Sequence, residues 1–231
     1  MIKQILVDHF PSLGRFKRWG VAWNHHVRPP RATYSQHQED RFILEFLSGY
    51  DLEGSIYVDV GANHPSDISN SYLLYRNGLK GIVVEPNKEL ISLFHRFRKR
   101  DIALAIGCSN SSAVLPFHVS KTPVLSSFAG ERDVNTYKTE YLPVMKLDDA
   151  LTNFSYKYIS LLSIDVEGLN FEVLEGAAST VKRSLLVCLE YDAADERDRF
   201  AALLGGKFTP LGEFGCNLLF VNEDLKKTYH K

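Results

Sequence analysis

The segment that decides the fold is IYVDVGANHP, residues 56–65. Its β-branched and aromatic residues predict a buried strand, and the strand runs directly into Gly61 and a polar turn. In open α/β sheets ligands bind beyond the carboxyl ends of the strands, so we expect Asp59, Gly61, Ala62 and Asn63 to face a binding crevice. The second and third glycines of a dinucleotide-binding loop are missing, which disfavours a dinucleotide.

Strand-like and helix-like segments alternate on either side of this stretch. Further buried strands are predicted at residues 81–85, 102–106, 159–164 and 185–191. Helices are predicted at 36–48 (with Ser35 and Gln38 as a capping box), 69–77, 87–98, from 168 through Leu174, and at 194–204. This alternation predicts an α/β fold with a doubly wound, mostly parallel sheet.

Three other segments depart from that alternation. Residues 208–214 and 217–221, separated by Gly215, predict an antiparallel hairpin at the end of the sheet. Residues 114–119 and 141–145 predict two extra strands, and they flank a loop, residues 120–140, that periodicity does not place.

Length and charge predict one main domain with a basic leader. The 231 residues carry a formal charge of -1, and no composition shift marks a second domain. Residues 1–34 hold six Lys/Arg and one acid, leaving 21 basic and 27 acidic residues in the remainder. We therefore divide the chain into a leader, residues 1–34, and a main domain, residues 35–231.

The leader also holds both tryptophans, Trp19 and Trp23. One interpretation is a helix and arm packed on the main domain. The other is a surface that touches anionic lipid or an acidic partner. Basic residues elsewhere are scattered and outnumbered by acids, so nucleic-acid recognition is not expected.

Cysteine usage and hydropathy indicate a cytoplasmic protein, with membrane association through the leader as an extension of that prediction. Cys108, Cys188 and Cys216 are odd in number and widely spaced, which predicts free thiols. No run of eighteen apolar residues occurs, and the leader lacks the apolar region of a signal peptide. The sequence predicts no oligomeric state.

The second predicted strand ends in Glu85 and Pro86. A carboxylate at this place can accept both hydrogen bonds of a ribose diol, as in dinucleotide-binding folds. Together, the two strand ends indicate a ligand that contains adenosine and does not require a phosphate-binding loop. S-adenosylmethionine fits this description, with its amino-acid end at Asp59 and Gly61.

Four segments together resemble the FkbM family of S-adenosylmethionine-dependent methyltransferases. They are SQHQED (35–40), YVDVGANHP (57–65), SNSYLLYRNGLKGIVVEPN (69–87) and LLSIDVEGLNFEVLEG (161–176). The resemblance covers about residues 35–192 and implies a class I methyltransferase fold, which is Rossmann-like, with seven strands and the last one antiparallel. It also implies O-methylation of hydroxyls on sugars, glycans or natural products. The chain departs from the family at Leu169 and Asn170, where His-Glu is common.

The resemblance and the strand ends together predict the site residues. The candidate general base is Asp165, followed by Glu167 and His64, because methylation of a hydroxyl needs a group that takes its proton. The predicted cofactor-binding residues are Gln36, Asp59, Gly61, Ala62, Asn63, Asn70, Glu85, Pro86, Ala105 and Asp165. Asp165 also fits a helix N-cap, and His64 also fits a loop residue bonded to backbone.

Metal assistance and two rival functions stay open at this stage. Asp165, Glu190 and Asp192 offer oxygen ligands suited to Mg²⁺, although no spacing demands a metal. An NAD-dependent oxidoreductase is disfavoured, because no Lys follows a Tyr by four residues. A non-catalytic binding or scaffold protein is the other alternative, and the Leu169-Asn170 departure keeps it open.

Overall fold

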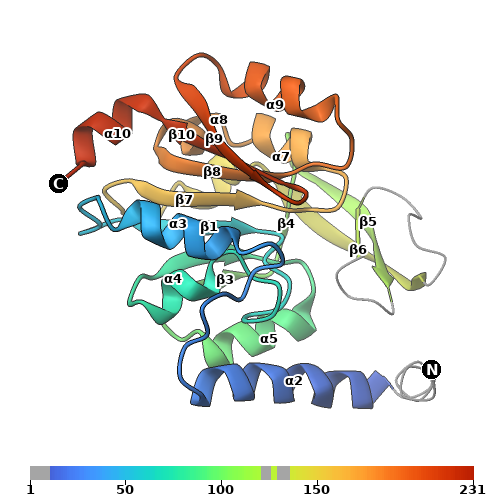
Figure 1. The fold of residues 1–231 in the computed structure, drawn as a ribbon. Coiled ribbons are helices and arrows are strands. Elements are labelled where there is room, and N and C mark those ends of the chain that lie inside the picture. The colour runs from blue at the N-terminus through green and yellow to red at the C-terminus, as the bar shows by residue number, and fades with distance from the viewer. Residues whose placement is uncertain (1–10, 121–125, 129–135) are drawn as a thin grey trace.

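Figure 1 shows the computed structural model of the protein, which describes residues 11–120, 126–128 and 136–231. Seven strands form its main sheet: β1 (Ile56–Val60), β2 (Gly81–Val84), β3 (Ile102–Leu104), β7 (Ile159–Ile164), β8 (Ser184–Glu190), β9 (Phe208–Phe214) and β10 (Asn217–Asn222). Their order is β3-β2-β1-β7-β8-β10-β9. The first five strands are parallel, whereas β10 runs antiparallel to both β8 and β9. The predicted mixed α/β fold with a mostly parallel sheet is therefore confirmed.

The strand order reverses between β1 and β7. The chain proceeds from β1 outward to β2 and β3 and then returns to pair β7 with the other edge of β1. Val60 at the end of β1 pairs with Val84 of β2 and Ile164 of β7. Such a reversal leaves a crevice beyond the carboxyl ends of the two central strands, which here carry the predicted site residues.

Helices cover both faces of the sheet (Figure 1). Val58 and Val60 of β1 face one core, and Tyr57 faces the other, as the two-residue period of a strand requires. The first core is covered by α6 (Leu147–Leu151), α7 (Asn170–Glu175), α8 (Ala178–Lys182) and α9 (Glu196–Leu204). The second is covered by α3 (Glu39–Leu47), α4 (Tyr72–Arg76), α5 (Lys88–Phe97) and α10 (Glu223–Tyr229).

The two extra strands form a sheet of their own. Strands β5 (Ala113–Ser120) and β6 (Thr136–Met145) pair antiparallel, and β4 (Gly107–Cys108) joins β6 in parallel. The loop predicted at 120–140 is shorter than expected, because β6 already begins at Thr136. Residues 121–125 and 129–135 of that loop lie outside the described residues.

The helix predicted at 36–48 begins later than its capping box. Gln38 has a left-handed backbone (φ 68°), and α3 starts at Glu39 without a side-chain cap. The hydroxyl of Ser35 donates instead to Asp40 (2.8 Å), whose carboxylate also accepts the amide of Tyr34 at 2.6 Å. The capping-box prediction was wrong, because the Ser35 side chain binds Asp40 and does not cap the first amides of α3.

Most other predicted bounds agree to within about two residues. The helix predicted from Ser69 starts only at Tyr72, and α6, α8 and α10 were not predicted. The three cysteines are free thiols, as predicted.

The leader contributes helix α2 (Pro11–Val27), which lies outside α5 (Figure 1). Ala22 of α2 packs with Leu90, Leu93 and Phe97 of α5 in a small core. The first interpretation of the leader, a helix packed on the main domain, is therefore confirmed for residues 11–27, and residues 1–10 lie outside the described residues.

Candidate active site

A cavity of about 320 Å³ opens beyond the carboxyl ends of β1, β2, β7 and β8. This volume is in the range of small-molecule sites. Of the predicted catalytic and cofactor-binding residues, seven line it: Gln36, Gly61, Asn63, Glu85, Pro86, Asp165 and Glu167. The cavity therefore lies at the strand reversal, where the sequence placed the ligand.

Gly61 has no room for a side chain, because the backbone that follows the neighbouring strand β7 passes very close to it. Its φ is +78°, and a Cβ atom there would lie 1.7 Å from the carbonyl oxygen of Asp165. Any side chain would push β1 and the β7 loop apart, and most side chains disfavour that backbone angle. The sequence predicted a tight turn with close ligand approach, whereas in the structure the close neighbour is the protein backbone itself.

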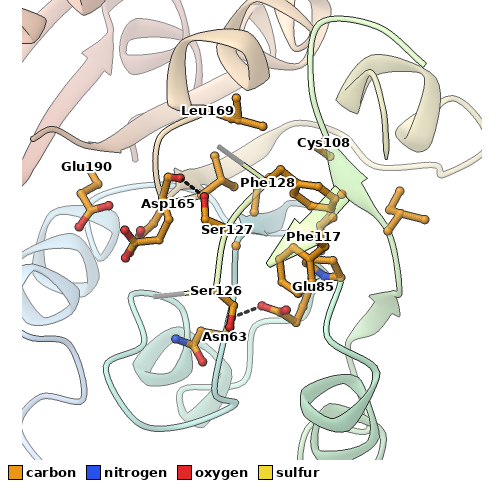
Figure 2. Close-up of a pocket in the computed structure, with 18 of the residues that line it drawn as sticks. Asn63, Glu85, Cys108, Phe117, Ser126, Ser127, Phe128, Asp165, Leu169 and Glu190 are labelled. Carbon is orange, nitrogen blue, oxygen red and sulfur yellow. Dashed lines mark hydrogen bonds between the residues drawn. The ribbon is translucent and has the colours of Figure 1, made fainter. Parts of the chain in front are cut away.

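Glu85 is buried at the end of β2, and both its oxygens accept backbone amides. Asn63 N–H donates to Oε2 at 2.9 Å and Asn87 N–H to Oε1 at 2.7 Å; Figure 2 draws the first of these bonds. Burial raises the pKa of Glu85 to about 7, although the two amide hydrogen bonds act to lower it. Each carboxylate oxygen has a second lone pair for a ligand, so the side chain is fixed and remains able to accept from a diol.

Three carboxylates gather on the opposite side of the cavity. Oxygens of Asp165, Glu167 and Glu190 lie within 4.8 Å of one another, and Figure 2 shows Glu190 and Asp165 across the cavity from Glu85. Burial raises the pKa of Asp165 well above its ordinary value, and the hydrogen bond and negative charge of Glu190 raise it further. We call Asp165, Glu167 and Glu190 the acidic trio.

The acidic trio suits a positive charge. Like charges this close do not all ionise unless a positive charge lies beside them, so the trio offers a place for a cationic ligand group or a divalent metal. Hard oxygen ligands of this kind suit Mg²⁺. Of the three possible metal ligands named from the sequence, Asp165 and Glu190 belong to this cluster, whereas Asp192 is exposed outside it and Glu167 is the third member.

The second sheet closes the cavity, which the sequence did not predict. Phe117 of β5 packs on Phe128, with ring centroids 4.8 Å apart, and both line the cavity (Figure 2). Ser127 holds this cover in place, since its hydroxyl donates to the carbonyl of Glu167 at 2.6 Å and its backbone pairs with His118. The 120–140 loop carries no periodicity, and only chain reversal between β5 and β6 brings residues 126–128 over the cavity.

Three predicted cofactor-binding residues, Asp59, Ala62 and Asn70, lie behind the cavity wall and bond to neighbouring segments of the protein. Asp59 accepts a hydrogen bond from the buried Ser71 hydroxyl, and burial raises the pKa of Asp59. Asn70 Nδ2 donates to Ser163 Oγ at 3.2 Å, and the Ala62 amide donates to the end of β2. These side chains do not line the cavity, because they face the second core or the loop interior.

Ala105 and His64 also lie away from the cavity. Ala105 is exposed just beyond β3. His64 Nδ1 accepts the amides of Ser66 (3.2 Å) and Asp67 (3.0 Å), and its Nε2 donates to the Arg18 carbonyl of α2 at 3.0 Å. Both ring nitrogens are thus occupied, and burial lowers the pKa of His64. In this structure His64 packs the loop against α2 and does not line the cavity.

The two residues that depart from the FkbM pattern, Leu169 and Asn170, differ in whether they line the cavity. Leu169 lines the cavity. Asn170 is buried and fastens two loops together, because its Oδ1 accepts the Val166 amide at 2.9 Å and its Nδ2 donates to the Glu190 carbonyl at 3.1 Å. Asn170 therefore positions both ends of the acidic trio.

The family model described as the Methyltransferase FkbM domain matches residues 59–204. The chain belongs to the FkbM methyltransferase family. The matched region begins at Asp59 of β1 and includes Glu85 and all three members of the acidic trio. Among curated proteins, none matches the chain.

Solved structures with a similar chain trace include other methyltransferases. The METTL16 MTase domain has a TM-score of 0.46 at 10% identity, over 80% of this chain and 66% of that one. Monomeric WbdD has a TM-score of 0.44 at 10% identity, over 85% of this chain and 42% of that one. The N-methyltransferase NodS from Bradyrhizobium japonicum has a TM-score of 0.37 at 12% identity, over 80% and 94%. This FkbM chain thus spans less than two thirds of the first two, and likenesses this distant say nothing about its reaction or substrate.

Family membership implies S-adenosylmethionine as the methyl donor, and the residues present fit it. Glu85 offers a fixed carboxylate for the ribose diol, and the acidic trio offers negative charge for the cationic amino-acid and sulfonium groups. Phe117, Phe128 and Ile106 offer apolar walls for a base. The FkbM fold therefore supplies a suitable partner for each part of this cofactor.

Proposed function

We propose that the protein is an S-adenosylmethionine-dependent O-methyltransferase acting on a hydroxyl of a sugar, a glycan or a glycosylated metabolite. The observation that carries this proposal is the single cavity in which Glu85 and the acidic trio face one another at the strand reversal. In this arrangement Glu85 would hold the ribose, and the turn of Gly61 and Asn63, together with the adjacent acidic trio, would hold the amino-acid end.

The lining favours an uncharged acceptor over a polyanionic one. Three carboxylates on one wall repel phosphate groups, and a cavity that binds nucleic acid needs basic side chains. A sugar hydroxyl meets no such repulsion and can donate hydrogen bonds to carboxylate oxygens. The proposed acceptor class rests on this charge argument together with the resemblance to FkbM enzymes.

Asp165 is the proposed base. S-adenosylmethionine supplies an electrophilic methyl group when bound, and the protein must hold the acceptor oxygen about 3 to 3.5 Å from it. A carboxylate that takes the hydroxyl proton adds on the order of a hundredfold or more. A positive charge beside Asp165 lowers its pKa, so a bound cationic methyl donor favours the ionised form that a base requires. Glu167, in the same trio, is the alternative base.

Magnesium is an additional proposal for the acidic trio, because its oxygens can also hold a divalent ion that polarises the acceptor. A magnesium titration of turnover tests it. An increase that Glu190→Gln abolishes and Asp192→Asn retains supports the metal. Turnover that is indifferent to Mg²⁺ and to chelation removes it.

Calorimetry with S-adenosylmethionine separates the enzyme from the alternative, a binding or scaffold protein that has kept the fold. We expect saturable binding by the parent chain and methyl transfer to at least one member of a panel of sugars and glycans. Cofactor binding with no transfer to any acceptor favours the scaffold alternative, which the Leu169-Asn170 departure keeps open. No binding at millimolar cofactor removes the methyltransferase proposal.

A further inference from the structure

An exposed apolar stripe runs along α2. Phe16, Trp19, Trp23 and Val27 are spaced by three and four residues, which places them on one face of a helix. Their exposed fractions are 74%, 41%, 44% and 54%. The two indole rings stack with centroids 5.5 Å apart and planes at 7°. The stripe is thus a continuous apolar surface that the described residues leave exposed.

The rest of α2 is firmly attached, so the stripe is not a sign of a loose helix. Ala22 is fully buried against α5, and Arg18 pairs with Glu89 of α5 at 2.8 Å. His25 Nδ1 lies 2.9 Å from the Ser66 carbonyl in the loop that follows β1. Figure 1 shows α2 as the outermost layer on this side of the molecule. The helix therefore presents the stripe outward at a fixed angle.

Positive charge flanks the stripe on both sides. Arg15 and Lys17 are exposed and, at about 100° per residue, project on either side of Phe16. No acidic residue occurs in α2, and the acid that meets it from α5, Glu89, is shared by Arg18 and, at 3.8 Å, Arg15. Among the described residues, this side of the molecule combines exposed aromatic rings with an excess of basic over acidic groups.

An apolar groove of about 740 Å³ separates α2 from α5 beside the stripe. Phe16, Trp19 and Leu93 line it together with the basic residues Arg15 and Lys88. Lys88 begins α5, two residues after Pro86 of the cofactor cavity. The groove and the proposed active site therefore share one end of the molecule.

Tryptophan and phenylalanine between basic side chains are the composition of a helix that lies in a membrane interface. Indole rings favour the boundary between headgroups and acyl chains, while lysine and arginine contact anionic headgroups. Among the described helices, none is long and apolar enough to cross a bilayer. The exposed rings and flanking basic groups of α2 fit a surface contact.

We propose that α2 docks the protein on an anionic lipid surface. Phe16, Trp19, Trp23 and Val27 enter the interface, and Arg15 and Lys17 contact the headgroups. The contact brings the Lys88 end of α5, and with it the rim of the cofactor cavity, close to the membrane.

The protein carries its own reporter, because its two tryptophans both belong to the stripe. Full-length protein is titrated with vesicles of phosphatidylcholine alone and of equimolar phosphatidylcholine and phosphatidylglycerol, and tryptophan emission and co-sedimentation are followed. We expect a blue shift and sedimentation with the anionic vesicles, both weakened by salt. Equal binding to both vesicle types, or binding without any blue shift, overturns the proposal.

Two variants with matched controls locate the contact. Phe16→Ala should weaken partitioning about tenfold, whereas Tyr141→Ala, which removes an aromatic ring with the same exposed fraction of 74% on β6, should not. Lys17→Glu should weaken it at least about fivefold, and Lys182→Glu, the same charge change on exposed α8, should not. Parent-like partitioning of Phe16→Ala overturns the proposal. So does a polyglutamate that binds as tightly as the anionic vesicles and is unaffected by Phe16→Ala, because the surface would then serve an acidic protein.

Discussion

A Cβ atom on Gly61 would lie 1.7 Å from the carbonyl oxygen of Asp165. These residues follow β1 and β7, the two adjacent parallel strands at which the strand order reverses. Their contact sets the distance between the cofactor turn and the proposed base. The geometry of the site therefore depends on the absence of a side chain at position 61.

Gly61→Ala should unfold the site. The added methyl group clashes with backbone on the buried side, and the φ of +78° is itself unfavourable for alanine. We expect a loss of roughly 3 kcal/mol or more in the free energy of unfolding, measured by urea denaturation, together with loss of S-adenosylmethionine binding. Gly20→Ala is the control, because nothing lies within 4 Å of its added Cβ in α2 and alanine favours a helix by up to about 1 kcal/mol. Similar stability changes for both variants would contradict the role of the contact.

Glu85→Gln should change how stability depends on pH. The folded-state pKa of about 7 lies above the ordinary 4.5, so the folded protein binds this proton more tightly than the unfolded chain does. Its contribution is therefore fully present at low pH and is lost as the pH rises from 4.5 to 7, by about 3 kcal/mol. Denaturation at several pH values should show this slope in the parent and in Glu53→Gln, an exposed control, and not in Glu85→Gln.

The same substitution should weaken the cofactor. A carboxylate accepts from a diol more strongly than a carboxamide does, and we expect at least about a tenfold loss of S-adenosylmethionine affinity by calorimetry. Affinity equal to the parent's would show that Glu85 does not hold the ribose.

Asp165→Asn should lower turnover far more than cofactor affinity. It removes the proposed base while keeping the shape of the side chain, so a decrease of about a hundredfold or more in kcat is expected. Asp192→Asn is the matched control, since Asp192 stands outside the acidic trio. Were the Asp165 variant to turn over normally, the proton acceptor would be another group, and Glu167→Gln would be the next variant to measure.

His64→Ala should lower stability and leave the pH profile of kcat in place. The substitution removes the acceptor of two backbone amides and the bond to α2, which costs about 1–3 kcal/mol. Burial lowers the pKa of His64 below 6.5, so the stability from the neutral ring is complete above pH 6.5 and is lost as the pH falls through the lower folded-state pKa. His95→Ala, on the exposed side of α5, is the control. A shift in the apparent pKa of kcat would instead support His64 as a catalytic residue.

Local patterns predicted the central strands because those strands are apolar on both faces. Strands β1 and β7 have the predicted bounds, and Gly61, Glu85 and Asp165 followed from the rule that site residues end neighbouring parallel strands. Helix α8 was missed for the opposite reason. Its first amides are capped by Asp148 (2.8 Å to both Ser179 N and Thr180 N), so the signal that starts it lies some thirty residues away.

The sequence by itself determined the α/β alternation, the FkbM resemblance and the strand ends that carry the site, because each depends on residues close together in the chain. Tertiary structure alone decided that Glu167 joins Asp165 and Glu190 in place of Asp192, that His64 serves packing, and that Phe117 and Phe128 cover the cavity. These outcomes depend on which backbone segments meet where the strand order reverses between β1 and β7, and where β5 pairs with β6. Such contacts join segments that are distant in the chain, and the hydrophobic periodicity of each segment does not reveal which other segment it will meet.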